Sequence, residues 1–391
     1  SFPSLRNASM RSRHRRAASL RWPMSVILAS RLCVVRVSMV SDAFRFSVTP
    51  SSACALNWPL VAASAVPYGA QNQTPQSLTR ADMDALPIEE ATGKDYASKN
   101  AGVMHACGHD GHTAMLLGAA KYLAETRNFD GTAVVIFQPA EEGGGGGLAM
   151  VQDGLVERWG IQEFYGMHNM PGYPVGTFAI REGAMMAAAD QFDIVVTGKG
   201  GHAAKPHECI DTTLVAAQII VALQSVVSRN VDPLKSGVVS VCVVETDSTA
   251  HNVIPQVVTL RGTARSLDPE VRDQIEAAIA RVAENTAAAL GARAEVHYER
   301  GYPVTMNDPQ ATGFAAEVAR QVAGSVNMDM LPLMAGEDFS YMLNERPGAY
   351  IFVGNGDTAM VHSPEYDFDD SAIPAGASWY AGMVEARMPA A

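Results

Sequence analysis

Residues 104–137, MHACGHDGHTAMLLGAAKYLAETRNFDGTAVVIF, decide the fold class. A turn rich in polar side chains runs directly into His112–Glu125, where the apolar residues have helical spacing and Asp110 is the expected N-cap. Thr132–Phe137 follows as a continuous apolar run rich in β-branched residues, which is typical of a buried parallel strand. The stretch therefore predicts a helix and a buried strand of an α/β sheet.

Further strands of the same kind lie on either side of this stretch. Phe164–Met167 is expected to be a short strand, and it ends in His168 and Asn169. Upstream, Asp82 and Asp84 come at the end of an expected strand, where they could also form a simple polar turn. Because the ligand sites of α/β sheets lie at the carboxyl ends of the strands, these polar residues stand where a site is expected.

A second module follows, with the order strand, helix, strand, strand, helix, strand. This is the order of the split βαβ, ferredoxin-like arrangement, and the α/β pattern then returns at Tyr302. We therefore divide the chain into a segment 1–79, a catalytic domain made of 80–182 and 301–391, and an inserted domain 183–300. The elements expected in the inserted domain are Gln191–Thr197, Thr212–Ser228, Gly237–Thr246, Val257–Ala264, Pro269–Leu290 and Ala294–Glu299.

Composition excludes several classes of protein. The chain has 391 residues, of which 48% are hydrophobic and 18% charged, so disorder is excluded as its overall state. The net charge of −12 speaks against a nucleic-acid partner, and no uninterrupted apolar run reaches the roughly 18 residues of a membrane span. Five scattered cysteines without a C-x-x-C pair fit a reduced, cytoplasmic protein. They are Cys33, Cys54, Cys107, Cys209 and Cys242.

The first 79 residues differ in composition from the rest of the chain. They hold nine arginines, no lysine and the single acid Asp42, a net charge of +8, so the remaining 312 residues carry −20. Such a segment fits an organelle-targeting sequence or a basic arm that binds RNA or membrane. We favour a third interpretation, translation of a GC-rich gene out of frame, and assign the segment no function.

Four clusters of side chains have the character of a chemical site. Imidazole, thiolate and carboxylate groups are the ligands that hold zinc and similar divalent ions. Two adjacent carboxylates could divide the work of hydrolysis, one binding metal and the other moving protons. The clusters are Met104–His112 with three histidines, Cys107 and Asp110; Gln138–Glu142 with Glu141 and Glu142; Gly166–Asn169 with His168; and Val361–Pro364 with His362.

Each cluster also has a structural interpretation. A lone histidine such as His168 or His362 is more often structural than a ligand, and the glutamate pair alone could begin a solvated helix. The His/Cys cluster favours a metal, because burying so many polar groups without partners is costly. The rival there is a nucleophilic Cys107 with His109 as its base, although nucleophiles usually draw their base from elsewhere in the fold.

Taken together, the motifs resemble the aminoacylase/carboxypeptidase metallopeptidase family, in the branch of hippurate hydrolases and N-acyl-amino-acid amidohydrolases. The resemblance covers about Ser77 to the C-terminus and implies a mixed, mainly parallel catalytic sheet flanked by helices, with an inserted lid or dimerisation domain. Nothing in residues 1–76 matches the helix and first strands that precede these motifs in the family. The motifs are RADMDALPIEE, MHACGHDGHT, QPAEEGGGG, MHN, GKGGHAAKPH, HNVIP, GEDFS and HSPEYDFDD.

The resemblance also implies a role for particular residues. Glu141 matches the general base, and His202 matches a histidine that reaches the active site across a dimer interface and stabilises the oxyanion. Asn252 and Arg265 are candidates for holding the substrate carboxylate. The implied metal ligands are Cys107, which bridges or neighbours two ions, and His109, Glu142, His168 and His362; His105, Asp110 and His112 are expected to orient them.

The implied reaction is metal-dependent hydrolysis of an N-acyl amino acid, hippurate-like compounds above all, to a carboxylic acid and a free amino acid. It implies two divalent ions per subunit, manganese or zinc first and nickel or cobalt as alternatives, and a homodimer or higher oligomer through the inserted domain. Three other hypotheses stay open: a dipeptidase or other deacylase of this family, an inactive metal-binding homologue, and binding of nucleic acid or membrane through the basic arm.

Overall fold

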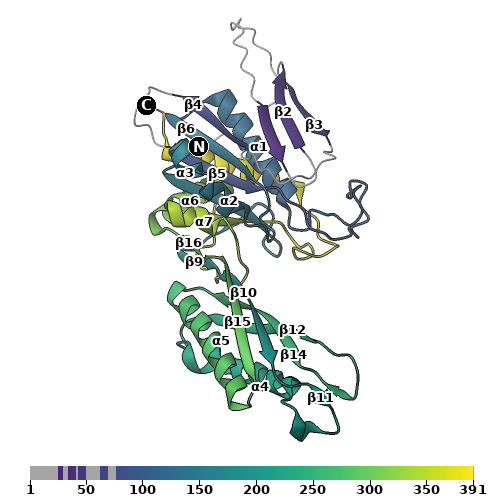
Figure 1. Cartoon of the computed structure of the whole chain (residues 1–391). Coiled ribbons are helices and arrows are strands. Elements are labelled where there is room, and N and C mark those ends of the chain that lie inside the picture. The colour runs from purple at the N-terminus through teal and green to yellow at the C-terminus, as the bar shows by residue number, and fades with distance from the viewer. Residues whose placement is uncertain (1–24, 30–33, 41–42, 50–61, 69–75, 391) are drawn as a thin grey trace, which may run out of the picture. The chain divides into compact units, whose positions relative to one another are not determined.

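The chain divides into two compact units, which we describe separately (Figure 1). The computed structural model describes the backbone of residues 25–29, 34–40, 43–49, 62–68 and 76–390, and the side chains from residue 79 to residue 390. The first unit draws on residues 1–183, 307–330 and 341–391, and the second on 184–306 and 331–340. The sequence-based boundaries at 183 and 300 stay a prediction.

The first unit is built on a six-stranded sheet in which the four central strands are parallel. The edge strands β4 and β8 run antiparallel to their neighbours. This mixed, mainly parallel sheet confirms the predicted fold class. In sheet order the strands are β4 (Ala62–Tyr68), β6 (Gly131–Gln138), β5 (Gln76–Asp82), β7 (Glu163–Met170), β17 (Gly348–Gly354) and β8 (Phe178–Ala179).

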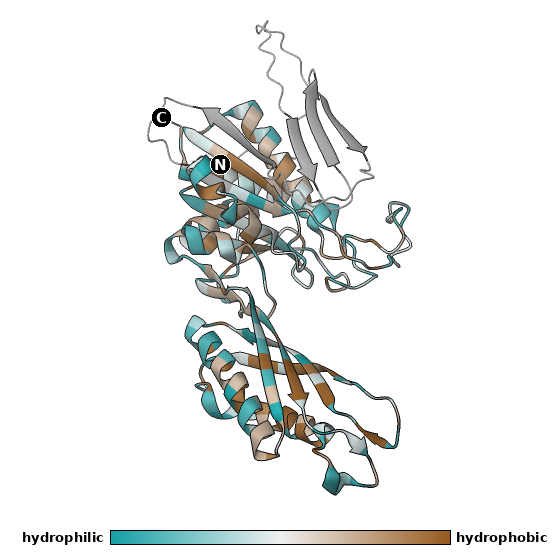
Figure 2. Ribbon diagram, viewed as in Figure 1, coloured by the Kyte–Doolittle hydropathy of each residue, from teal (hydrophilic) through white to brown (hydrophobic). Residues whose placement is uncertain are grey.

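Apolar faces of helices and strands form the core of the first unit (Figure 2). All seven residues of β17 are buried, as expected for a central parallel strand. Helix α8 (Ile373–Arg387) packs against α1 (His109–Thr126) and α6 (Pro309–Ala323), and the Trp379 indole N–H donates to Ala315 O at 3.0 Å. The other elements here are α2 (Gly146–Gln152), α3 (Leu155–Trp159), α7 (Ser340–Glu345), η4 (Asp370–Ala372) and a separate antiparallel sheet of β1 (Ser25–Ala29), β2 (Val34–Val40) and β3 (Ala43–Thr49).

The start of α1 differs from the sequence-based expectation. The helix begins at His109, and its N-cap is Gly108, in the left-handed region at φ 80°, so the prediction of Asp110 as the cap is wrong. The physical reason is long-range: a Cβ at Gly108 would lie 2.4 Å from the Tyr366 hydroxyl and 2.5 Å from Asn169 Nδ2. Only glycine fits this close approach and this backbone conformation. As a result His109 itself lies in the first turn of the helix.

The second unit has the predicted βαββαβ order. Its sheet is antiparallel throughout, in the order β12, β14, β10, β15, which is the strand order of a ferredoxin-like domain. The strands are β10 (Ala188–Thr197), β12 (Gly237–Thr246), β14 (Val257–Ser266) and β15 (Arg293–Tyr302), with helices α4 (Thr212–Ser225) and α5 (Pro269–Ala289). Shorter elements are η2 (Pro206–Glu208), η3 (Val226–Asn230), and the ribbons β9 (Gly183–Met186) with β16 (Thr305–Asn307) and β11 (Gly201–His202) with β13 (Val253–Ile254).

Helix α4 and the η3 turns that continue it are unusually apolar. Together they span Thr212–Asn230, which by length and mean hydropathy (1.4) is enough to cross a membrane. The finding is weak evidence for a membrane span, because Val215, Ile219 and Leu223 of this helix lie in the core of the second unit and a core helix passes the same test.

A buried carboxylate joins three elements of the second unit. Asp190, on β10, is 1% exposed and accepts hydrogen bonds from Arg272 Nε (2.9 Å) and Nη2 (2.5 Å) on α5. It also accepts from the Tyr298 hydroxyl (2.7 Å) and the Gly301 N–H (3.0 Å) on β15. Because every lone pair of the carboxylate is used, its burial is compensated.

This network predicts a large difference between two substitutions on the same strand. Asp190→Ala removes the carboxylate partner of the Arg272 guanidinium, whose side chain is only 12% exposed, and should lower the free energy of unfolding of this unit by roughly 3–5 kcal/mol. Asp193→Ala removes a carboxylate that is 48% exposed and 3.7 Å from Arg261, and should cost less than about 1 kcal/mol. Urea denaturation measures both; equal losses would contradict the structural role of Asp190.

Candidate active site

Three neighbouring strands of the first unit end in the polar residues that form the candidate site. Strand β5 ends at Asp82, β6 leads into Glu141 and Glu142, and β7 carries His168 near its end. The carboxyl ends of parallel strands meet at one edge of a sheet, so these side chains converge. The prediction that His168 follows its strand needs a small correction, because β7 extends to Met170.

The five predicted metal ligands form two groups that share one residue. The ligand atoms of Cys107, His109 and His168 lie within 4.8 Å of one another, and so do those of Cys107, Glu142 and His362. Within these groups Cys107 Sγ is 3.3 Å from His168 Nε2, and His362 Nε2 is 3.0 Å from Glu142 Oε1. A ligand common to both groups has the position that a bridge between two ions requires. A third group joins His109 to Glu141 and Glu142.

Two buried atoms of these groups have the character of metal ligands. His109 Nε2 and Glu142 Oε1 are buried and have no hydrogen-bond partner among the described residues. The approach of His362 to Glu142 Oε1 is close, but it lacks hydrogen-bond geometry. Buried polar atoms without partners are costly, and the donor set of thiol, imidazole and carboxylate suits zinc or a similar divalent ion.

Asp84 orients three parts of the site. Its Oδ1 accepts from His109 Nδ1 at 3.2 Å, which leaves Nε2 of that ring free to bind an ion. The same carboxylate accepts the backbone N–H of Glu141 (Oδ1, 3.2 Å) and of Glu142 (Oδ2, 2.8 Å). Burial alone would raise the pKa of Asp84, but the hydrogen bond and the charge of His109, together with the Glu142 N–H, hold that pKa below its usual value. Asp84 therefore stays ionised and fixes the position of a ligand and of the glutamate pair.

His112 is enclosed in a different network. Its Nδ1 donates to Asp82 Oδ1 at 2.5 Å, and its Nε2 accepts the Asn169 N–H at 2.8 Å. Although Asp82, His109 and His112 also form a group of the right size for an ion, both nitrogens of His112 are already occupied. Arg80 Nη1 holds Asp82 Oδ2 at 3.0 Å, and both side chains are fully buried. His112 thus has the place of an orienting residue.

The electrostatics of the site favour a cation. Burial alone would lower the pKa of His109, but Asp82 and Asp84 raise that pKa to about 9. Burial, followed by the neighbouring carboxylate of Glu142, raises the pKa of the Cys107 thiol well above its usual value. His168 is the opposite case, since burial and the other imidazoles lower its pKa to about 3. Its Nδ1 donates to Asn169 O at 2.6 Å, so the lone pair of Nε2 faces the thiol.

The remaining predicted residues lie elsewhere. Asp110 is exposed, and its carboxylate accepts the N–H of the next residue, Gly111. His105 Nδ1 is buried without a partner among the residues described here, and His105 belongs to neither ligand group. His202 and Asn252 are exposed in the second unit, where the Ala203 N–H donates to Asn252 O at 3.0 Å. The roles predicted for these residues stay predictions.

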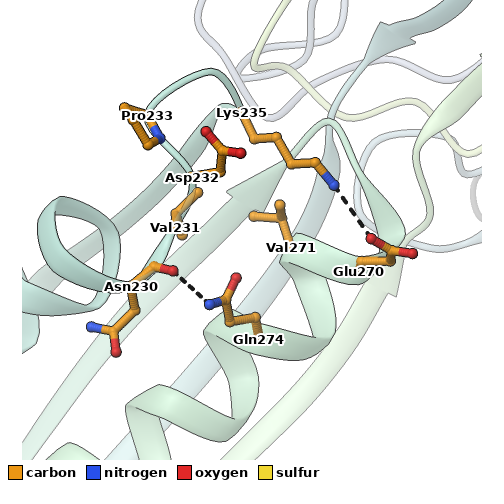
Figure 3. Close-up of a pocket in the computed structure, with 8 residues that line it drawn as sticks. All are labelled: Asn230, Val231, Asp232, Pro233, Lys235, Glu270, Val271 and Gln274. Atoms are coloured by element: carbon orange, nitrogen blue, oxygen red, sulfur yellow. Dashed lines mark hydrogen bonds and ion pairs between the residues drawn. The ribbon is translucent and has the colours of Figure 1, made fainter.

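Arg265 is not near Asn252 within the second unit. It lies at the far end of β14, eight residues after Val257, which at about 3.3 Å per residue is roughly 26 Å along the strand. Burial lowers the pKa of its guanidinium. The structure thus does not bring the two carboxylate-holding candidates together in this unit. A pocket of the same unit, between η3 and the start of α5 around Asn230 and Gln274, contains none of the predicted residues (Figure 3).

Asp82 and Asp84 contact the predicted site residues, although the sequence assigned them no role beyond their position at a strand end. The signal was present as two carboxylates at a strand end, next to the hallmark RADMDALP. What the sequence did not contain is the pairing that places β5 between β6 and β7. That central position brings both aspartates against His109 and His112, which lie 25 to 30 residues away in the chain.

Comparisons with known proteins agree with this geometry. The model of peptidase family M20/M25/M40 matches residues 78–386. Hippurate hydrolase from Campylobacter jejuni is 44% identical over 306 residues, 78% of this chain and 79% of that protein. N-acetyl-L-cysteine deacetylase from Bacillus subtilis is 44% identical over 304 residues, 78% of this chain and 72% of that protein.

A solved structure also resembles this chain. A dinuclear metal-binding peptidase of the M20 family from Bacillus subtilis superimposes with a TM-score of 0.71 at 34% identity, over 83% of this chain and 84% of that one. The matched region contains both ligand groups and Glu141. The chain therefore belongs to peptidase family M20/M25/M40 and is a metal-dependent hydrolase of amide bonds.

Proposed function

We propose that the chain hydrolyses N-acyl amino acids of the hippurate type to a carboxylic acid and a free amino acid. The observation that carries this proposal is the convergence of five potential metal ligands beside a buried second carboxylate, Glu141. The names of two relatives, a hippurate hydrolase and an N-acetyl-L-cysteine deacetylase, support an acylated amino acid as the substrate.

Glu141 has the surroundings of a general base. It is 7% exposed, its backbone N–H is held by Asp84, and a carboxylate oxygen lies within 4.8 Å of ligand atoms of His109 and Glu142. Ions bound by the five ligands would polarise the amide carbonyl and lower the pKa of a water molecule. Glu141 takes the proton of the attacking water and passes it to the leaving amino group.

Glu141→Gln should separate catalysis from metal binding. The amide keeps the size of the side chain but cannot accept the proton, so turnover of hippurate should fall by roughly 10²–10⁴-fold while bound metal is unchanged. Glu142→Gln, the matched control, removes a proposed ligand and should lower the metal content. Release of glycine and elemental analysis of the purified protein measure the two effects. Loss of metal in Glu141→Gln would show that the two roles are reversed.

The shared position of Cys107 predicts an unequal effect of ligand substitutions. Because Cys107 belongs to both groups, Cys107→Ser should weaken the binding of both ions, whereas His168→Ala or His362→Ala should weaken one. Cys209→Ser, in the second unit and outside the groups, serves as the control. Metal per chain after dialysis against manganese or zinc measures the difference. A Cys107→Ser protein that keeps both ions would contradict a bridging role.

We further propose that the second unit forms a homodimer. Strand β12 is an edge of its sheet and exposes Val243 (41%) and Val244 (56%), and α4 exposes Leu214 (54%) and Val221 (68%). Exposed apolar side chains on a helix and an unprotected apolar edge strand are typical of an interface. Through such a dimer, His202 of the partner subunit could reach the site and stabilise the oxyanion.

Charged substitutions on this surface should produce monomers. The double variant Val221→Asp and Val244→Asp introduces like charges into the proposed interface and should halve the mass measured by light scattering after gel filtration. Leu234→Asp, at a 94% exposed residue of a turn, is the control and should leave the mass unchanged. A wild-type protein that is monomeric at micromolar concentration would refute the dimer.

A further inference from the structure

The proposed function does not explain the five glycines at 143–147. We propose that Gly144 and Gly146 are positioning residues, whose missing side chains let the chain pack onto the Pro139–Ala140 turn and thereby hold Glu141 and Glu142 in place. This inference rests on the roles proposed for the two glutamates.

Ala140 has an unfavourable backbone conformation directly before the glutamate pair. Its φ of 58° is in the left-handed region, which residues with a Cβ rarely adopt. Such a conformation persists only where the surrounding structure holds it. One visible restraint is the N–H of Gly146, which donates to Ala140 O at 3.1 Å. A second is the close packing of the glycine run against this turn.

Four of the five glycines of this run fall into two kinds. A Cβ on Gly144 would lie 2.6 Å from Ala140 Cβ, and a Cβ on Gly146 would lie 1.8 Å from Pro139 O. Gly143 and Gly145 have open space around the same position, and instead have positive φ values of 83° and 62°. Close contact with the turn therefore requires glycine at 144 and 146. At 143 and 145 the positive φ of the loop backbone favours glycine instead.

Displacement of Ala140 would be passed directly to the glutamates. Glu141 is the next residue, and the N–H groups of Glu141 and Glu142 both donate to the carboxylate of Asp84. Asp84 is held in turn by His109. A shift of the turn by a few tenths of an ångström would therefore misalign two amides with a fixed acceptor, and both side chains would move relative to the ligand groups.

Gly144→Ala tests this inference, because Gly144 is exposed and its substitution threatens the turn more than the core. We expect kcat for hippurate to fall on the order of 10–100-fold, since small misplacements of catalytic groups have effects of this size, and the affinity for manganese to fall with it. The double variant Ala140→Gly/Gly144→Ala removes one of the two methyl groups that collide. Measured against Ala140→Gly alone, it should recover most of the lost kcat and affinity.

The matched control is Gly145→Ala. It imposes a left-handed conformation on a residue with a Cβ but creates no collision, so it should lower the melting temperature while kcat and manganese affinity are retained. The positioning role is overturned if Gly144→Ala keeps both properties, or if the double variant recovers neither. It is also overturned if Gly144→Ala fails to fold while the double variant folds, because the contact then serves stability alone.

Failure of the proposed function gives a different result. If Glu141→Gln retains turnover, the assignment of Glu141 as base is wrong. The manganese affinities and melting temperatures of the glycine variants would still report whether the collision at Ala140 moves Glu142.

Discussion

One carboxylate, that of Asp84, connects the parts on which the rest of the site depends. It accepts hydrogen bonds from the His109 ring and from the backbone N–H groups of Glu141 and Glu142, so it joins the start of α1 to the turn after β6. These segments are distant in sequence and meet only because β5 lies between β6 and β7. The arrangement of the sheet thus determines which ring nitrogen of His109 is left for a ligand role.

Local patterns in the sequence were enough for much of the fold. The edge strand Gly237–Thr246 was predicted with the bounds that the structure has, and the βαββαβ order of the second unit was also correct. Apolar periodicity and turn residues report each element on its own. These local patterns place Cys107 and His109 near the start of a helix. Because they report each element on its own, they do not show that Cys107 is shared between two groups of ligand atoms.

What the sequence could not supply depends on contacts between distant segments. The choice of Gly108 over Asp110 as N-cap follows from the hydroxyl of Tyr366 and the amide of Asn169, which leave no room for a Cβ. Local propensity favours aspartate at an N-cap, and here the tertiary contact outweighs it. The Arg80–Asp82 pair is a second example, because its full burial requires that β5 be covered on both sides.

The glutamate pair shows why neighbours in sequence can have different chemistry. The backbone N–H groups of both glutamates donate to Asp84. The side chains have different surroundings: Glu141 is buried, at 7% exposed, and the Glu142 carboxylate lies beside the half-exposed imidazole of His362. The turn at Ala140, with its positive φ, changes the direction of the chain immediately before the pair. Both glutamates share a group with His109, but only Glu142 also belongs to the group with Cys107 and His362. This difference fits the proposal that Glu142 binds metal while Glu141 acts as the general base, a role that a metal ligand does not take.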